Sequence, residues 1–185
     1  MLVLLAQPQT ELEEQARWLG TLDSFLSERG RYAAIDFSRH DMWIKPDRVY
    51  LAPAAQHVEL AKILSLDFIP LPELSDRSMG SLSGRPYRET MAEFPRRNWL
   101  VWQRSYWTAP PEGESLFDIS DRVLRAFTTK ILPITAGETV LIICSANIIR
   151  LIIGYLRHLE EDEIPKIAVE GLVPYVINSA LGCTE

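Results

Sequence analysis

The sequence has few cysteines and no grouping of them that would bind a metal. Cys144 and Cys183 are the two cysteines among 185 residues, and they do not stand at metal-ligand spacing. Cys144 lies inside an apolar run, where a buried free thiol is the usual case. We therefore expect no disulfide scaffold, no metal site and a reducing compartment.

Long apolar runs and clustered positive charge are also absent. The net charge is −6, and the longest basic run is Arg96-Arg97. Nucleic acids and anionic membranes bind concentrated basic faces, so we expect neither as a partner. The apolar stretch from Met1 to Ala6 has no basic leader and is far shorter than the ~20 residues of a membrane span. We expect a cytoplasmic protein without a cofactor.

The composition is that of a globular protein. Hydrophobic residues make up 47% of the chain and charged residues 24%. The length is sufficient for one substantial core and short for two, so we expect a single domain over residues 1–185.

Short apolar runs alternate with segments of helical spacing. We expect strands at Leu2–Leu5, Val49–Leu51, Phe68–Ile69, Thr139–Cys144 and Val173–Ile177. We expect helices at Glu11–Glu28, Pro53–Ser65, Tyr87–Phe94, Arg97–Trp107, Glu114–Leu132 and Ile148–Leu159. Gly30 would end the first helix, and Asn147 would cap the last. This alternation predicts a three-layer α/β/α sandwich with a mostly parallel central sheet.

In such sheets the site lies beyond the carboxyl ends of the strands. The segments that follow the expected strands are therefore the places where functional side chains should gather. They are Ala6–Thr10, Ala52–His57, Leu71–Gly84 and Ser145–Ile148.

Four sequence blocks resemble motifs of the histidine phosphatase superfamily, most of all its cofactor-dependent phosphoglycerate mutase branch. Leu74 to Gly84 resembles the family's Leu-x-Glu-x-x-x-Gly-x-x-x-Gly loop, and Arg104 to Tyr106 resembles its Arg-Arg-Ser-Tyr stretch. Glu114-Ser115 resembles a Gly-Glu-Ser helix start. Val140 to Arg150 resembles the strand and helix that carry the second active-site histidine. Their order and spacing carry the resemblance over nearly the whole length.

The resemblance implies phosphoryl transfer through a phosphohistidine, yet the matching positions carry other residues. The Arg-His pair after the first strand is Ala6-Gln7, the helix arginine is Gln56, the acid/base Glu is Asp76, and the second histidine is Ser145. The loop between the nucleophile and the first helix is expected to be deleted, because the helix is expected to begin at Glu11.

These replacements remove the chemistry that the family uses. An imidazole attacks phosphorus through a ring lone pair, whereas the lone pair of the Gln7 amide nitrogen is delocalised. Phosphoryl transfer also depends on cations that stabilise the phosphoryl oxygens, each contact being worth roughly 4 kcal/mol at an effective dielectric near 20. We therefore expect a catalytically inactive pseudoenzyme with a binding or regulatory role.

Several alternatives stay open. Arg77, Arg104 and Asn147 could form a weak anion-binding site, or the two arginines could be solvated surface residues. Residual or altered phosphatase, mutase or hydrolase activity could use Asp76 or Ser145.

Two further features bear on partners and on new chemistry. A triad of Ser145, His57 and Asp76 is disfavoured, because His57 is expected to point away from the cleft. The aromatic residues of the segment around Trp102 are expected to pack in the core or a lid; where exposed, they could anchor a protein partner or a homodimer. These residues are Trp99, Trp102, Tyr106 and Trp107.

Overall fold

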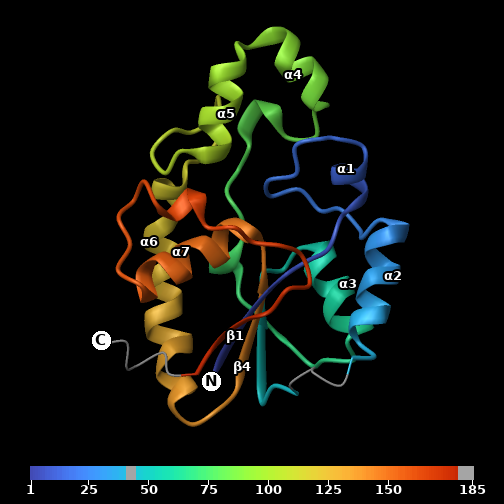
Figure 1. Cartoon of the computed structure of the whole chain (residues 1–185), viewed down its shortest axis with the longest axis vertical. Helices are drawn as coiled ribbons and strands as arrows, with labels where there is room; N and C mark the ends of the chain where they lie inside the picture. Colours follow the sequence, from blue (N-terminus) through green and yellow to red (C-terminus); the bar gives the residue numbers. More distant parts are fainter. Residues whose placement is uncertain (41–44, 179–185) are drawn as a thin grey trace.

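The computed structural model describes residues 1–40 and 45–178, so Cys183 lies outside the described residues. A five-stranded sheet with the order β3-β2-β4-β1-β5 forms its centre (Figure 1). Its strands are β1 (Leu2–Ala6), β2 (Arg48–Leu51), β3 (Ile69–Pro70), β4 (Val140–Cys144) and β5 (Tyr175–Ile177). All neighbouring pairs are parallel except β1 and β5. The expected mostly parallel sheet is confirmed.

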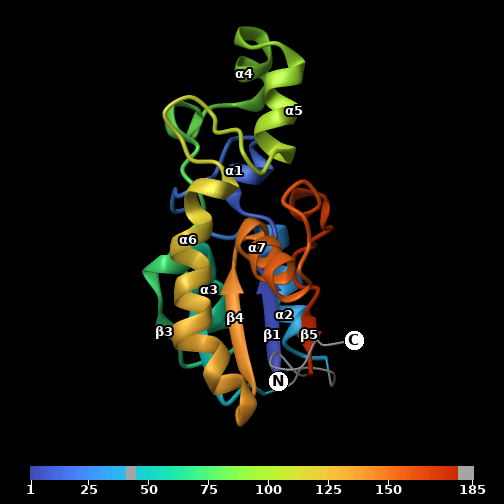
Figure 2. The same cartoon turned by 90° about the vertical axis from the view of Figure 1, so that its left-hand side faces the viewer.

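Helices cover both faces of the sheet, with α2 and α3 on one face and α6 and α7 on the other (Figures 1 and 2). The α-helices are α1 (Glu11–Glu14), α2 (Glu28–Phe37), α3 (Ala55–Ile63), α4 (Tyr87–Glu93), α5 (Arg96–Arg104), α6 (Leu116–Ala126) and α7 (Ala146–Leu156). A π-helical turn over Phe127–Ile131 continues α6. The three-layer sandwich is confirmed. No helix in the described ranges is long and apolar enough to cross a bilayer.

The central strands are buried on both sides, as the lack of alternation in β4 predicts. All five residues of β1 and of β4 are buried. Leu2 and Leu4 face α6 and α7, whereas Val3 and Leu5 face α2 and α3. The side chains of β1 alternate between two faces that are both covered by helices. This packing on both faces holds the ends of the strands, and the residues that follow them, in place.

The expected helix over Glu11–Glu28 is wrong. Thr10 caps α1 through a capping box with Glu13, but this helix ends after one turn and Ala16 adopts a positive φ of 53°. Of the apolar residues at helical spacing, Leu26 joins the core under α2 and α3. Trp18, which is not part of that repeat, packs with Met79, Leu82 and Trp102 instead. Helix α1 does begin at Glu11, so the expected deletion of the loop before it stays a prediction.

Gly30 lies inside α2 rather than at a helix end. It is buried, and a Cβ atom at this position would lie 2.2 Å from the Gln9 carbonyl oxygen. The glycine therefore allows α2 to pack against the segment that follows β1.

Helices α4 and α5 form a cap beyond the carboxyl ends of the strands, seen at the top of Figure 1. Trp18, Met79, Leu82 and Trp102 are buried beneath it, with Trp99 partly buried. The expectation of lid packing is confirmed for Trp102. Outside this cluster, Tyr106 is also buried, whereas Trp107 is 57% exposed.

Candidate functional site

Gln7 and Ser145 leave the sheet at the same edge. Strands β1 and β4 are parallel neighbours, and Ala6 pairs with Cys144 in the register, so the next residue of each strand stands at the carboxyl end. Strand β2 pairs with the other side of β4 and ends at Leu51. The segments that follow β1, β2 and β4 therefore lie together at the carboxyl edge of the sheet, as the sequence predicts.

A partly open cavity of about 190 Å³ lies at this edge, and we name it the acidic cavity. Three of the expected positions, Gln56, Asp76 and Ser145, line it. The full lining is Leu19, Gly20, Thr21, Asp23, Ala52, Pro53, Ala54, Gln56, His57, Ser75, Asp76 and Ser145. Asp23 and Asp76 contribute its carboxylates, and none of these lining residues is Lys or Arg.

His57 points into the cleft, so the expectation that it points away is wrong. Its ring is 2% exposed and lies between Gln7 and Ala52: Nε2 is 3.0 Å from Gln7 Oε1, and Nδ1 is 3.1 Å from the Ala52 carbonyl oxygen. The physical reason is that α3 begins at Ala55 rather than at Pro53, which places His57 in the first turn beside the cavity.

Burial keeps the His57 imidazole neutral. It lowers the pKa of His57 to about 4, although the Ala52 carbonyl opposes this shift. The carbonyl can only accept, so Nδ1 carries the ring proton and Nε2 accepts. Nε2 faces the Gln7 side-chain amide, 3.0 Å from its Oε1, and no hydrogen bond joins the ring to Ser145, whose Oγ has no partner among the described residues.

Ser145 has a side chain without a hydrogen-bond partner. It occupies the N-cap position of α7, yet its Oγ makes no capping bond. The residue is 6% exposed, and its buried Oγ has no partner in the described part of the chain. Asn147 is not the cap that the sequence suggested, because α7 already begins at Ala146.

Asn147 instead links two parts of the site. Its Nδ2 donates to Asp76 Oδ1 at 3.0 Å, and its Oδ1 accepts from Arg150 Nη1 at 3.1 Å. The backbone N–H of Arg77 also donates to Asp76 Oδ1, at 2.7 Å. These donors fix the orientation of the Asp76 carboxylate.

Arg122 of α6 holds the loop that carries Asp76. Its Nη1 donates to the carbonyl oxygens of Glu73 and Ser75, both at 2.7 Å. Its Nη2 donates to the Asp76 carbonyl oxygen at 3.0 Å. A planar guanidinium with several donors suits this clamping of backbone carbonyls, because its geometry is fixed.

A second cavity lies on the other side of the Asp76–Asn147 hydrogen bond. It measures about 330 Å³, and we name it the arginine pocket. Its lining is Trp18, Arg77, Met79, Gln103, Arg104, Asn147, Arg150 and Pro165. It brings together the expected anion-site residues Arg77, Arg104 and Asn147. Within the described residues, no carboxylate forms an ion pair with its three guanidinium groups.

Arg77 is buried, so the alternative that it is a solvated surface residue is wrong. The residue is 4% exposed; Nη2 donates to the Trp102 carbonyl oxygen at 2.5 Å, while Nε and Nη1 are buried without a partner. Burial lowers the pKa of Arg77, Asp76 opposes this effect, and Arg150 adds to it. Arg104 is exposed and stands in the wall of the same pocket.

Sequence reasoning missed Arg150 and Arg122. Arg150 is partly buried, and burial lowers its pKa. Its spacing of three residues from Asn147 on one helix was the signal that could have found it. Arg122 gave no such signal, because its partners are backbone carbonyls of a distant loop.

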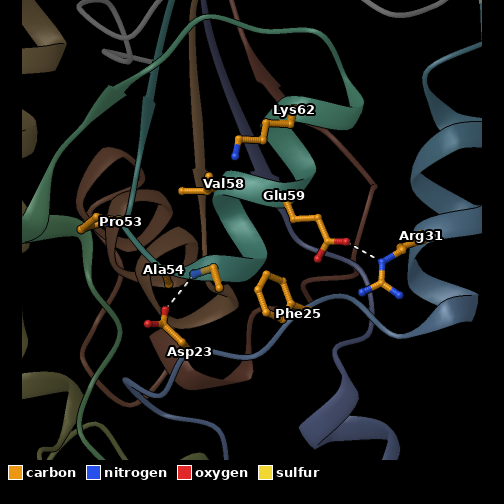
Figure 3. A pocket seen from close by; sticks show the side chains of 9 residues that line it. Asp23, Phe25, Arg31, Pro53, Ala54, Val58, Glu59 and Lys62 are labelled. Atoms are coloured by element: carbon orange, nitrogen blue, oxygen red, sulfur yellow. Dashed lines mark hydrogen bonds and ion pairs between the residues drawn. The ribbon is translucent and has the colours of Figure 1, made fainter.

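Figure 3 shows a third, open hollow of about 640 Å³ beside α3. Its charged side chains largely satisfy one another and the backbone: Arg31 Nε lies 2.5 Å from Glu59 Oε1, and Asp23 Oδ1 accepts from the Ala55 N–H at 2.8 Å. Asp23 lines both this hollow and the acidic cavity.

The residues and their arrangement match a known family. A family model described as Histidine phosphatase superfamily (branch 1) matches residues 2–178. The chain belongs to that superfamily.

Two curated members of the histidine phosphatase superfamily illustrate the similarity in sequence. The chain is 32% identical over 190 residues to the 2,3-bisphosphoglycerate-dependent phosphoglycerate mutase of Bartonella henselae, covering 96% of this chain and 92% of that protein. It is 39% identical over 112 residues to phosphoglycerate mutase 1 of Gloeobacter violaceus, covering 60% of this chain. That second alignment spans about half of the Gloeobacter protein, 48%.

Solved structures share the fold of this chain. The alpha-ribazole phosphatase of Shigella flexneri superposes with a TM-score of 0.80 at 20% identity, covering 100% of this chain and 98% of that one. A mycobacterial glucosyl-3-phosphoglycerate phosphatase in complex with VO3 gives 0.79 at 22% identity, covering 94% and 90%. At such identities the likeness supports the α/β sandwich alone.

Proposed function

We propose that this superfamily member lacks phosphohistidine chemistry and acts as a binding protein for a small anion, held in the arginine pocket. The observation that carries the proposal is the contrast between the two cavities. The cavity at the ends of β1 and β4 has carboxylates and no Lys or Arg, whereas its neighbour has three guanidinium groups.

The acidic cavity lacks a nucleophile that suits phosphoryl transfer. The Gln7 amide has a delocalised lone pair, and the neutral His57 ring is buried and engaged by Gln7 and Ala52. Asp23 and Asp76 repel a phosphoryl group in place of the cations that normally stabilise its oxygens. Because such electrostatic stabilisation is usually the largest single contribution, its loss argues against turnover.

A hydrolase built on Ser145 finds no support in these contacts. A serine nucleophile needs a base within hydrogen-bond reach, and Ser145 Oγ has no partner in the described part of the chain. Asp76 could hold or release a proton, but its Oδ1 is held by the Arg77 N–H and by Asn147.

The arginine pocket supplies what an anion requires. A buried guanidinium without a paired carboxylate is unfavourable, because desolvation of the charge is not repaid. Arg77 has two such unpaired nitrogen atoms, and Arg104 and Arg150 stand in the same wall. Since the curated relatives are named for phosphoglycerate, a phosphorylated three-carbon acid is the first ligand to test.

Two measurements on the purified protein test the proposal. p-Nitrophenyl phosphate and phosphoglycerates are supplied as substrates to the native protein and to Asp76→Asn. Calorimetry with 3-phosphoglycerate is carried out on the native protein and on Arg77→Met. We expect no turnover and saturable binding that Arg77→Met weakens. Turnover that disappears in Asp76→Asn would refute the non-catalytic assignment; binding unchanged by Arg77→Met would refute the anion site.

A further inference from the structure

An open groove of about 460 Å³ lies between the end of α5 and the connection that follows α7, and we name it the aromatic groove. Leu100, Val101, Tyr106 and Trp107 supply its apolar lining. Helix α5 packs against the 3₁₀ turn Ile164–Lys166, which belongs to the other wall. In Figure 2 the end of α5 lies above α7, next to the orange-red connection after α7. Neither of the two cavities at the strand ends includes these apolar residues, so the groove is a separate surface.

Large apolar side chains at the aromatic groove are exposed as one contiguous group. Val101 is 41% exposed and Trp107 57% exposed, and Phe117 at the start of α6 is 50% exposed. The Trp107 ring lies against Tyr106 and Phe117, with ring centroids 5.2 and 4.7 Å apart. Because Tyr106 is buried, the exposed rings rest on a fixed support. A contiguous exposed apolar group that includes Trp is typical of a protein interface.

The α5 wall of the groove carries positive charge. Arg97, Val101 and Arg104 recur at helical spacing and are all exposed, so they share one side of α5. Helix α5 contains no Asp or Glu, and neither arginine forms an ion pair within the described residues. Glu93, which precedes α5, pairs with Arg85 instead. The charge of this wall is therefore not compensated by its own side.

The opposite wall is acidic. Four consecutive residues, Glu160 to Glu163, are exposed carboxylates. Lys166 forms an ion pair with Asp162 at 3.0 Å, and both side chains are more than two-thirds exposed. Arg157, exposed at the end of α7, offsets one further negative charge at most. The wall therefore keeps a net negative charge after its own cations are counted.

A second copy of the chain matches both walls at once. In a symmetric dimer the same surface of both copies meets at a two-fold axis. An axis that runs along the groove, in the plane of contact, exchanges the two walls. The basic wall of each copy then faces the acidic wall of the other, and the apolar groups meet near the axis. A different partner would need an apolar centre and the same two charges in reverse order.

The net charge of −6 opposes this association only weakly. At physiological ionic strength, exposed charges more than ~8 Å apart are largely screened. Opposite charges that face each other across the contact lie closer together, so they determine the relative orientation of the two copies.

We infer that this protein forms a symmetric homodimer through the aromatic groove, with Val101, Trp107 and Phe117 at the centre of the interface. Arg97 and Arg104 of each copy face the acidic wall of the other. Of the partners that the sequence left open, this is the homodimer. Arg104 also lines the arginine pocket, but the inference requires no anion there and is tested without one.

Sedimentation equilibrium of the native protein without added ligand measures the dissociation constant of the dimer. Trp107→Ala and Val101→Glu should each raise this constant at least about thirtyfold, which corresponds to the ~2 kcal/mol of an interface hot spot. Tyr32→Ala is the matched control, because Tyr32 is a 66% exposed aromatic residue on α2, on the other face of the sheet; it should leave the constant unchanged. Circular dichroism establishes that each variant folds.

A charge exchange tests the relative orientation of the two copies. Arg97→Glu and Glu161→Lys should each associate more weakly than the native protein, because like charges then face each other. An equimolar mixture of these two variants should recover the association, since opposite charges face each other again in the mixed dimer. A native protein that stays monomeric up to ~1 mM would overturn the inference. So would a dimer that Trp107→Ala and Val101→Glu leave unchanged, or a mixture that associates no more strongly than either variant alone.

Discussion

The acidic cavity and the arginine pocket are neighbours that differ in the sign of their charge. They meet at the hydrogen bond between Asp76 and Asn147, with carboxylates on one side and guanidinium groups on the other. Both lie at the carboxyl edge of the same sheet, which determines where a site forms. The side chains that the loops and helices supply determine which charge the site accepts. The comparison shows that the residues that form the sheet differ from those that give each cavity its charge.

Adding positive charge at and beside the acidic cavity should produce the largest effect. In the variant Ala6→Arg/Gln7→His/Gln56→Arg/Ser145→His, imidazole and guanidinium groups replace neutral ones at the family positions. We expect hydrolysis of p-nitrophenyl phosphate to rise at least about a thousandfold over the native protein, because each lost stabilising contact is worth ~10²–10³. An acid-labile phosphate label should appear on the variant.

The control for this gain is Gln7→His/Ser145→His, which restores the imidazoles without the arginines and should react much more slowly. Circular dichroism establishes that both variants fold. Hydrolysis of p-nitrophenyl phosphate by the native protein at the rate of the fourfold variant would contradict the argument that the acidic cavity does not support phosphoryl transfer.

Acid should weaken the folded state through His57. Its pKa is about 4 in the folded protein and 6.5 ordinarily, so between these values the unfolded chain binds more protons. Stability is therefore lost as the pH falls from about 6.5 towards 4, by up to roughly 3 kcal/mol. Urea unfolding of the native protein and of His57→Gln at pH 7.5 and 5 measures this loss.

The pH dependence should be smaller in His57→Gln. His40→Gln is the matched control, because His40 is exposed beside Asp36 and should keep the native pH dependence. An unaltered slope in His57→Gln would mean that the buried ring is not the group that titrates.

Removing the Arg77 charge should have opposite effects on binding and on stability. Arg77→Met should weaken 3-phosphoglycerate binding about tenfold or more, since charge-assisted hydrogen bonds are lost. The free energy of unfolding of the free protein should stay equal or rise, because the desolvation cost of a buried guanidinium, which Asp76 offsets only in part, is removed. Calorimetry and urea unfolding measure both. Arg125→Met, on the exposed side of α6, should leave binding unchanged; a loss of stability in Arg77→Met would contradict the unpaired state of Arg77.

The smallest effect should come from Arg122, which touches neither cavity but holds the loop between them. Arg122→Met should lower 3-phosphoglycerate affinity by about threefold and speed amide hydrogen exchange over residues 73–78, because three hydrogen bonds to backbone carbonyls are removed. Exchange rates equal to those of the native protein would show that the loop is held by other contacts.

The sheet and its coverage could be predicted from the sequence, because apolar runs without alternation are sufficient to indicate strands buried on both faces. The segment after Glu11 could not. Its apolar residues repeat at helical spacing, but only Leu26 of them lies in the core, and periodicity alone does not distinguish such a connection from a helix.

The edge of the sheet where the site lies was likewise predictable, and the orientations of its side chains were not. The direction of His57 depends on whether α3 begins at Pro53 or at Ala55, a difference of two residues that helix-start signals do not resolve. The burial of Arg77 depends on the Trp102 carbonyl, which belongs to the cap. Such long-range contacts leave no local pattern in the sequence.

The Asp76–Asn147 hydrogen bond between the two cavities has a consequence for regulation. Hydrogen bonds join Asp76 to Asn147 and Asn147 to Arg150. A molecule that binds Asp76 in the acidic cavity would therefore change the position of the Arg150 guanidinium in the arginine pocket. If a ligand in one cavity changes the affinity of the other cavity by some factor, a ligand in the second cavity changes the affinity of the first by the same factor. Binding in the two cavities would therefore be coupled through the Asn147 side chain.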